Sequence, residues 1–281
     1  MSAVGRTPRL ERLRELPSLP QVVLDLQAAL AREDVSLDAI ADTVSHDQAL
    51  AAKTLRIANC SFYGVSTRVV SIRQAIAILG LRSISTLLVA AAVSDRFPRI
   101  ACVGFDLGRY WRHSVAVALC AREIARHARI DADAAFTAGL LHDLGRLALA
   151  SQSPQSLERV YAYRGEHDCQ MLAAERAEIG TDHAEMGAEV GSRWHFGAEV
   201  IEAMRLHHEP PDAPRATLVD VVHVADNIAH ALDLAHDPDE IVPPLDAAAW
   251  NRVGLTQGQC FTLFENTAAE LDGLCEALTV N

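Results

Sequence analysis

The sequence predicts an all-α protein. Half of its residues are hydrophobic and about one residue in six is alanine, while aromatic residues make up only 5%. This balance favours closely packed helices over strands, which prefer aromatic and β-branched side chains. Apolar residues recur at helical spacing along most of the chain, without useful stretches of strand-like alternation. With 281 residues, the chain is long enough for one large domain or two smaller ones.

The first hundred residues are expected to form a lobe of about five short helices. Pro17 and Pro20 precede the first helix, and Ser36 is placed to cap the second. Gly64 and its polar neighbours indicate a loop over 59–71. The helices are predicted at about 22–33, 36–45, 48–58, 72–79 and 82–93.

A second helical lobe is predicted after Phe97, Pro98 and Gly104, which break the apolar pattern. Its first helix spans Leu107 to His127, and Pro210 ends a later helix. Further helices are expected at about 131–150, 155–164, 168–178, 182–194, 198–208, 216–234 and 256–277. The expected units are residues 1–98 as the N-terminal lobe, 99–235 as a helical bundle and 236–281 as a C-terminal helical extension.

The composition also limits which kinds of partner the protein is expected to bind and in which cellular compartment it is expected to act. The net charge of -12 argues against broad nucleic-acid binding, because the chain as a whole repels phosphate backbones. The most apolar stretch, Ala75–Val93, contains Arg82 near its middle and is interpreted as a buried helix pair rather than a membrane span. The six cysteines form no CxxC pair and are expected to be reduced and mostly buried. The N-terminus does not resemble a secretory signal, so we expect a cytoplasmic protein without membrane association.

The densest chemical signal is His142 beside Asp143, within the apolar run Gly139–Arg146. Adjacent side chains on a helix diverge by about 100°. Both can therefore reach one ion only if it lies between their directions, which suits a metal bridged by the carboxylate. A histidine that is merely oriented by its neighbour is the alternative.

Further histidines and one carboxylate on other predicted helices support a metal site: His113, His183, His207, His208 and Asp226. Helical bundles often build metal sites from such inward-pointing side chains. Mixed imidazole and carboxylate ligands suit Fe, Mn, Zn or Co, and two ions could share Asp143.

The remaining histidines have other interpretations. His223 and His230 share a helix face with Asp226, and they either support a ligand by hydrogen bonding or lie at the surface. A hydrogen-bonded or surface role is favoured for the others, which are His46, His127, His167, His195 and His236.

Three motifs in the N-terminal lobe resemble the HDOD domain, the HD-related output domain of bacterial signalling proteins. They are LPSLP at Leu16–Pro20, TLRIANCSFYG at Thr54–Gly64 and SIRQAIAILG at Ser71–Gly80. The order of the candidate ligands resembles the HD superfamily of metal-dependent phosphohydrolases, in the version with two adjacent histidines found in HD-GYP phosphodiesterases. Together the resemblance covers about residues 13–230 and implies an N-terminal lobe packed on an HD-type bundle.

The resemblance also assigns roles to residues of this chain. It implies a metal-ligand set of His113, His142, Asp143, His183, His207, His208 and Asp226. If the protein is an enzyme, Asp143 takes part in catalysis, and Arg146 stands where HD-GYP enzymes carry a lysine that contacts phosphate. Arg109 replaces a carboxylate found in three-metal members, so a site of one or two ions is expected.

Two functions follow from this pattern. The first is a signalling output or scaffold protein that binds a regulatory protein partner through its N-terminal lobe. Its support is that Pro210 directly follows His207-His208-Glu209, without the Gly-Tyr-Pro loop that HD-GYP enzymes use around their substrate. The second is a metal-dependent phosphohydrolase acting on a nucleotide or cyclic dinucleotide, which the retained ligands favour. We also expect Phe62 and Tyr63 to pack near the lobe interface, because few aromatics are available.

Overall fold

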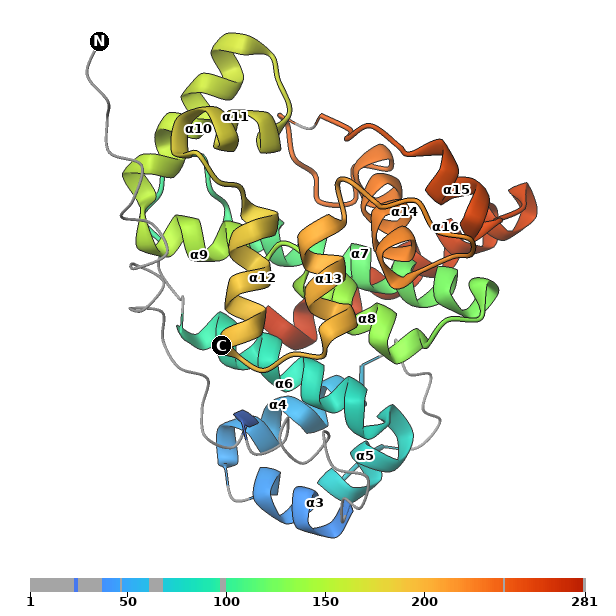
Figure 1. Ribbon diagram of the computed structural model, residues 1–281. Helices are drawn as coiled ribbons and strands as arrows, with labels where there is room; N and C mark the ends of the chain where they lie inside the picture. The colour runs from blue at the N-terminus through green and yellow to red at the C-terminus, as the bar shows by residue number, and fades with distance from the viewer. Residues whose placement is uncertain are drawn as a thin grey trace.

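The computed structural model describes residues 23–24, 37–45, 47–60, 68–96, 100–239 and 241–279. Within these ranges every regular element is an α-helix (Figure 1). The predicted all-α, two-lobed fold is confirmed. His46, Phe62 and Tyr63 lie outside the described residues, as does most of the expected first helix, of which only Val23 and Leu24 are described.

The N-terminal lobe follows the predicted periodicity closely. Its described helices are α3 (Leu37–Ser45), α4 (Gln48–Ala58), α5 (Ile72–Leu79) and α6 (Leu81–Arg96). Ser71 caps α5 by accepting a hydrogen bond from the backbone N–H of Gln74, as its place before the apolar run allows. These helices bury apolar faces against one another, and α3, α4 and α5 are too short to be stable without that packing.

The turn between α5 and α6 divides the apolar stretch Ala75–Val93 into two helices. Gly80 connects the two helices with a φ of +78°, a conformation that side chains with a Cβ rarely adopt. In the described residues no single helix is long and apolar enough to span a membrane; α5 and α6 meet that test only as a pair bent by 112°. Leu87 and Leu88 of α6 are at most 1% exposed, as expected for a buried helix pair.

The second lobe is built around one long helix, α7 (Leu107–Ala128) (Figure 1). Asp106 caps its first turn, and α8, α14 and α16 pack against its sides. The other helices of this lobe are α8 (Ala132–Leu141), α9 (Leu144–Gln152), α10 (Pro154–His167), α11 (Met171–Ile179), α12 (His183–Arg193), α13 (Ala198–Leu206), α14 (Leu218–Ala231), α15 (Ala247–Val253) and α16 (Gln257–Thr279). Helix α15 is absent from the helices predicted above, although Asp246 caps it and Gly254 ends it.

The C-terminal helix α16 contacts both lobes. It packs along α7 and also touches α4 and α6. Arg56 of α4 donates a hydrogen bond to the carbonyl oxygen of Ala277, at 3.1 Å. The last helix therefore helps to hold the N-terminal lobe against the bundle.

The six cysteines are free thiols, as expected. Cys102 and Cys120 are buried, whereas Cys60, Cys169, Cys260 and Cys275 are only partly buried. The expectation that the cysteines are mostly buried therefore holds for two of the six.

The predicted helix over 131–150 is wrong in one respect that matters for the site. The chain forms two helices, and the break between α8 and α9 falls at His142 and Asp143. Asp143 has φ -94° and ψ 13°, outside the helical region, and its carboxylate makes no capping hydrogen bond to α9. The two side chains are therefore not restricted to the 100° offset of neighbours on one helix, and the carboxylate is directed into the lobe.

Two glycines let helix backbones approach closely near this break. A Cβ on Gly139 of α8 would lie 2.8 Å from Cα of Ala118 on α7. A Cβ on Gly145 of α9 would lie 1.9 Å from the carbonyl oxygen of His183, the first residue of α12. Only glycine allows α9 and the start of α12 to pack this closely.

Gly145→Ala should therefore force α9 and α12 apart and destabilise the protein by about 1–3 kcal/mol or more, the usual cost of overpacking a core. Gly165→Ala is the matched control, because a Cβ there meets nothing within 4 Å. In an exposed helix it should stabilise the protein by up to about 1 kcal/mol. Thermal denaturation followed by circular dichroism measures both, and equal melting temperatures would contradict the close-packing explanation.

Candidate metal centre

The seven candidate ligands come from separate elements and meet in one buried site. Several stand where helices begin or end: at the α8–α9 break, at the first residue of α12 and just after α13. The others project from within α7 and α14. They are His113, His142, Asp143, His183, His207, His208 and Asp226. All are less than 5% exposed except His208, which is partly buried.

One half of the site surrounds Asp226. Its Oδ1 lies 3.1 Å from Nε2 of His113 and 3.5 Å from Nε2 of His142. The two ring nitrogens are themselves 3.3 Å apart. Two ligand atoms bound at about 2.0–2.2 Å to one metal ion stand about 3 Å or slightly more from each other, so these separations suit a shared ion.

The other half surrounds Asp143. Its Oδ1 lies 3.3 Å from Nε2 of His183 and 3.9 Å from Nε2 of His207. Nε2 of His208 is 2.9 Å from Nε2 of His183. The same oxygen of Asp143 is 3.8 Å from Nε2 of His142, so this carboxylate stands between the two halves.

Backbone carbonyls orient two of the histidines. Nδ1 of His142 donates to the carbonyl oxygen of Gly139 at 2.8 Å, and Nδ1 of His207 donates to that of Met204 at 2.9 Å. A neutral imidazole that donates from Nδ1 presents a lone pair at Nε2, the form that binds a metal. These two rings therefore direct an acceptor atom into the site.

His223 supports this arrangement from outside the ligand set. It is 1% exposed, and its Nδ1 donates to the carbonyl oxygen of His207 at 2.6 Å. Its Nε2 accepts a hydrogen bond from the backbone N–H of Asp246 at 2.8 Å. Of the two interpretations left open for His223, the supporting one is correct and the surface one is wrong.

Glu175 orients His183, although it is not among the candidate residues predicted from the sequence. Its Oε2 accepts hydrogen bonds from Nδ1 of His183 at 2.6 Å and from the backbone N–H of the same residue at 2.8 Å. The glutamate is fully buried on α11, eight residues before its partner. In the sequence, Glu175 is one of several charged residues on a helix that also carries apolar ones. That pattern is a weak signal for a buried residue that orients a ligand.

The buried charges shift one another's pKa values. Burial raises the pKa of Asp143, but His142 and Arg146 outweigh burial and hold it well below its usual value. Burial lowers the pKa of His183, but Glu175 and Asp143 outweigh it and raise that pKa to about 9. Burial, together with His142 and His183, lowers the pKa of His207 to about 3. Both Asp143 and Asp226 thus have lowered pKa values that favour the ionised carboxylate. Among the imidazoles the pKa is lowered for His113, His207 and His208 and raised for His142 and His183.

Several polar atoms in the site lack hydrogen-bond partners, although they are fully buried. They are Nε2 of His207 and both carboxylate oxygens of Asp226. Burying such groups without compensation costs several kcal/mol. Ionised carboxylates and neutral imidazoles are the ligand types that divalent Fe, Mn, Zn or Co bind, so the residues fit the implied metal.

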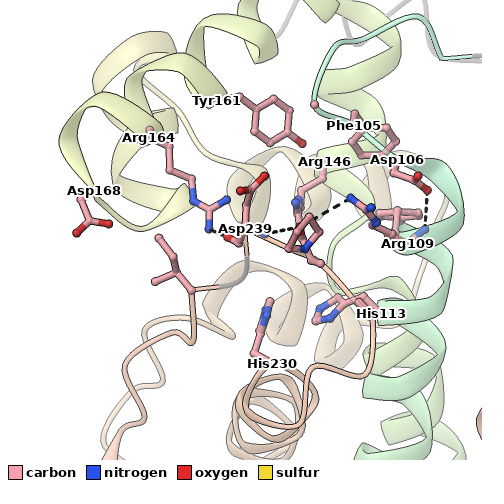
Figure 2. Close-up of a pocket in the computed structure, with 17 residues that line it drawn as sticks. Phe105, Asp106, Arg109, His113, Arg146, Tyr161, Arg164, Asp168, His230 and Asp239 are labelled. Carbon is pink, nitrogen blue, oxygen red and sulfur yellow. Dashed lines mark hydrogen bonds and ion pairs between the residues drawn. The ribbon is translucent and has the colours of Figure 1, made fainter.

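The site borders two cavities, of about 710 and 430 Å³. Figure 2 shows the larger one, with Arg109, Arg146 and Arg164 around it and His113 and His230 below them. Arg146 lines both cavities and donates to Oδ2 of Asp143 at 3.0 Å. Arg164 donates to the carbonyl oxygen of Asp239 at 2.6 Å, which brings the segment after α14 across the cavity.

The histidines expected outside the site lie where predicted, as far as the structure describes them. His127, His167, His195 and His236 are exposed. His230 differs from them: its side chain is 14% exposed, and its Nε2 lies 3.2 Å from Oδ1 of Asp226. The surface interpretation of His230 is therefore wrong.

Comparison with known proteins assigns the family. The family model for the HDOD domain matches residues 16–210. This chain belongs to the HDOD family. The match includes the three N-terminal motifs and six of the seven candidate ligands, all but Asp226.

Solved structures share the architecture over nearly the whole chain. An HDOD domain protein of unknown function from Geobacter sulfurreducens has a TM-score of 0.80 at 23% identity, covering 97% of this chain and 99% of its own. A proposed phosphohydrolase from Shewanella amazonensis has a TM-score of 0.77 at 26% identity, covering 99% of this chain and 100% of its own.

A curated protein is also similar to this chain at the sequence level. An uncharacterized protein from Treponema pallidum is 27% identical over 237 residues, which is 83% of this chain. This chain spans only 45% of that relative's length.

Glu175→Gln should weaken metal binding by about 10- to 100-fold, the usual effect of losing a carboxylate that orients a histidine ligand. Titration with chelator-buffered Zn²⁺ at pH 7 and pH 9 measures this. A proton on His183, whose pKa is about 9, competes with the ion, so wild-type affinity should rise with pH over this range. The variant should show a smaller rise, because it lacks the carboxylate that raises that pKa.

Glu178→Gln is the control for this experiment. Glu178 lies on the same helix, α11, and only pairs with Arg159 at 3.5 Å near the surface. Its affinity and pH profile should match wild type. A Glu175 variant with an unchanged pH profile would show that the carboxylate does not act through His183.

Proposed function

We propose that this HDOD protein is a bacterial signalling output or scaffold protein whose HD-like lobe binds one or two divalent metal ions. The observation that carries the metal assignment is the buried set of seven histidines and aspartates arranged around Asp143 and Asp226. Family membership and the fold shared with HDOD proteins support the signalling role. We place the protein in the cytoplasm, where such output modules meet their partners.

The residues would divide between two ions. His113, His142, Asp143 and Asp226 would hold the first, and Asp143, His183, His207 and His208 would hold the second. Fe, Mn, Zn and Co are all compatible with this donor set. Asp143 would be shared, because its Oδ1 faces histidines of both halves.

In the signalling role, the metal centre stabilises the lobe and a protein partner binds the N-terminal lobe. Three family motifs map to that lobe, yet among its described residues there is no cluster of histidines and carboxylates that could hold a metal. A surface that binds the partner would explain these motifs. Structural packing of the lobe is the alternative explanation.

Phosphoester hydrolysis is the second candidate, and one observation favours it. The metal site opens onto cavities lined by Arg109, Arg146 and Arg164, together with Asp106, Asp168, Asp237 and Asp239. The arginines are cations that suit a phosphate-bearing ligand such as a nucleotide. Structural similarity to a proposed phosphohydrolase supports the same idea. A bound divalent ion would supply Lewis-acid activation. Arg146, 3.0 Å from Asp143, would then neutralise charge on the phosphate.

Asp143→Ala should abolish metal retention, since it removes the carboxylate common to both halves. Elemental analysis of desalted protein measures the ion content. Wild type should gain about 2.7 kcal/mol of stability at an ion concentration 100 times its Kd, and the variant should gain none. Glu199→Ala, which changes an exposed carboxylate on α13, should behave like wild type.

Measuring the hydrolysis of cyclic di-GMP and bis(p-nitrophenyl) phosphate by the same samples distinguishes the two functions. If metal-loaded wild type hydrolyses either compound and Asp143→Ala does not, the protein is a hydrolase and not a scaffold. No turnover with metal retained supports the scaffold. A wild-type protein that binds no metal and keeps its stability in chelator would contradict the metal assignment altogether.

The partner proposal predicts that Asp38→Lys with Asp42→Lys weakens partner capture without changing metal content. Both aspartates are exposed on α3. Asp38 makes an exposed ion pair with Arg73, so losing that pair should cost at most about 1 kcal/mol. Quantitative cross-linking mass spectrometry measures the capture. If only substitutions near the histidines reduced capture and signalling, the N-terminal surface would not be the output.

A further inference from the structure

His230 lies beside the metal site but is not part of the ligand pattern found in the sequence. It stands one turn after Asp226 on α14, and its Nε2 is 3.2 Å from Oδ1 of that residue. Its ring centroid lies 4.5 Å from that of His113. The imidazole therefore faces the same half of the site as His113 and His142.

Three imidazole nitrogens surround one carboxylate oxygen at this point. Nε2 of His113, His142 and His230 lie 3.1, 3.5 and 3.2 Å from Oδ1 of Asp226. Neither oxygen of Asp226 has a hydrogen-bond partner of suitable geometry, although the residue is 1% exposed. The ligand atoms of His113, Asp226 and His230 all lie within 4.8 Å of one another, so a cation placed among them could bind all three residues.

The position of His230 relative to the cavities sets it apart from the other site histidines. It lines both the larger and the smaller cavity, as Arg146 does. His113 lines only the larger one, and His183 and His208 line only the smaller one. Figure 2 shows His230 beside His113 at the boundary between site and cavity.

We propose that His230 is an additional metal ligand that closes the Asp226 half of the site on its cavity side. The inference rests on the proposed metal-binding function. This half would then have five protein ligands, namely His113, His142, Asp143, Asp226 and His230. The half around His183, His207 and His208 would keep fewer, so an anionic ligand entering from the smaller cavity would meet the less saturated ion.

The test compares Zn²⁺ affinity of wild type, His230→Ala and His230→Gln by titration of metal-free protein in chelator buffers, with elemental analysis of the loaded forms. His230→Ala should weaken one of the binding steps at least about 10-fold, since losing even a group that only orients a ligand costs that much. His230→Gln should be equally weak, because an amide keeps an N–H donor but replaces the imidazole nitrogen. Millimolar imidazole should restore binding to His230→Ala, because the cavities give it access to the vacated position.

His127→Ala is the control, since His127 is an exposed histidine on α7. Circular dichroism establishes that each variant is folded. Equal affinities of wild type and His230→Ala would overturn the ligand role of His230 while leaving the metal site intact. So would full binding by His230→Gln, or a loss that imidazole does not reverse. Absence of metal binding in wild type would instead overturn the proposed function, and this inference with it.

Discussion

The carboxylate of Asp143 is the group on which the site depends. It is 3% exposed, and its burial is tolerated because His142, His183, His207 and Arg146 surround it. An ionised carboxylate in such a place must be paired, since an isolated buried charge would be neutralised instead. The helix break at this residue directs the side chain inward, and Gly145 lets the start of α12 approach until His183 reaches it. Backbone packing thus brings the histidines close to one oxygen atom of Asp143, and the surrounding charges keep that carboxylate ionised.

The rest of the bundle holds the candidate ligands in place around Asp143. Helix α7 provides His113 and the surface against which α8 and α14 pack, with Gly139 allowing the close contact to α8. Hydrogen bonds from His142 and His207 to backbone carbonyls, and from His183 to Glu175, hold the rings with their Nε2 atoms toward the carboxylates. His223 secures the turn that carries His207. A site oriented by this many fixed groups loses little entropy when it binds an ion, which favours tight binding.

The two candidate functions share this centre and differ in what the cavities are for. In a scaffold, the ion serves chiefly to stabilise the lobe, because it binds only the folded chain. In a hydrolase, the arginines beside the ion would position a phosphate. The chain belongs to the HDOD family, and its seven candidate ligands lie beside cavities that Arg109, Arg146 and Arg164 line, so activity assays decide between the two roles. A fifth ligand from His230 would make the two halves of the centre unequal in either case.

Local sequence determined most of the helices and the identity of seven candidate ligands. Apolar periodicity placed α4 at Gln48–Ala58, because that helix buries one face and its pattern is set by its own residues. Periodicity could not show the break at His142 and Asp143, since the residues on both sides favour helix and the packing of α9 against α12 decides where the chain turns. Nor could it reveal Glu175 or the inward position of His230, which depend on how α11, α12 and α14 are placed in space. Helix formation is a property of neighbouring residues, whereas a buried site is made by side chains far apart in the chain, and only tertiary packing decides which of them meet.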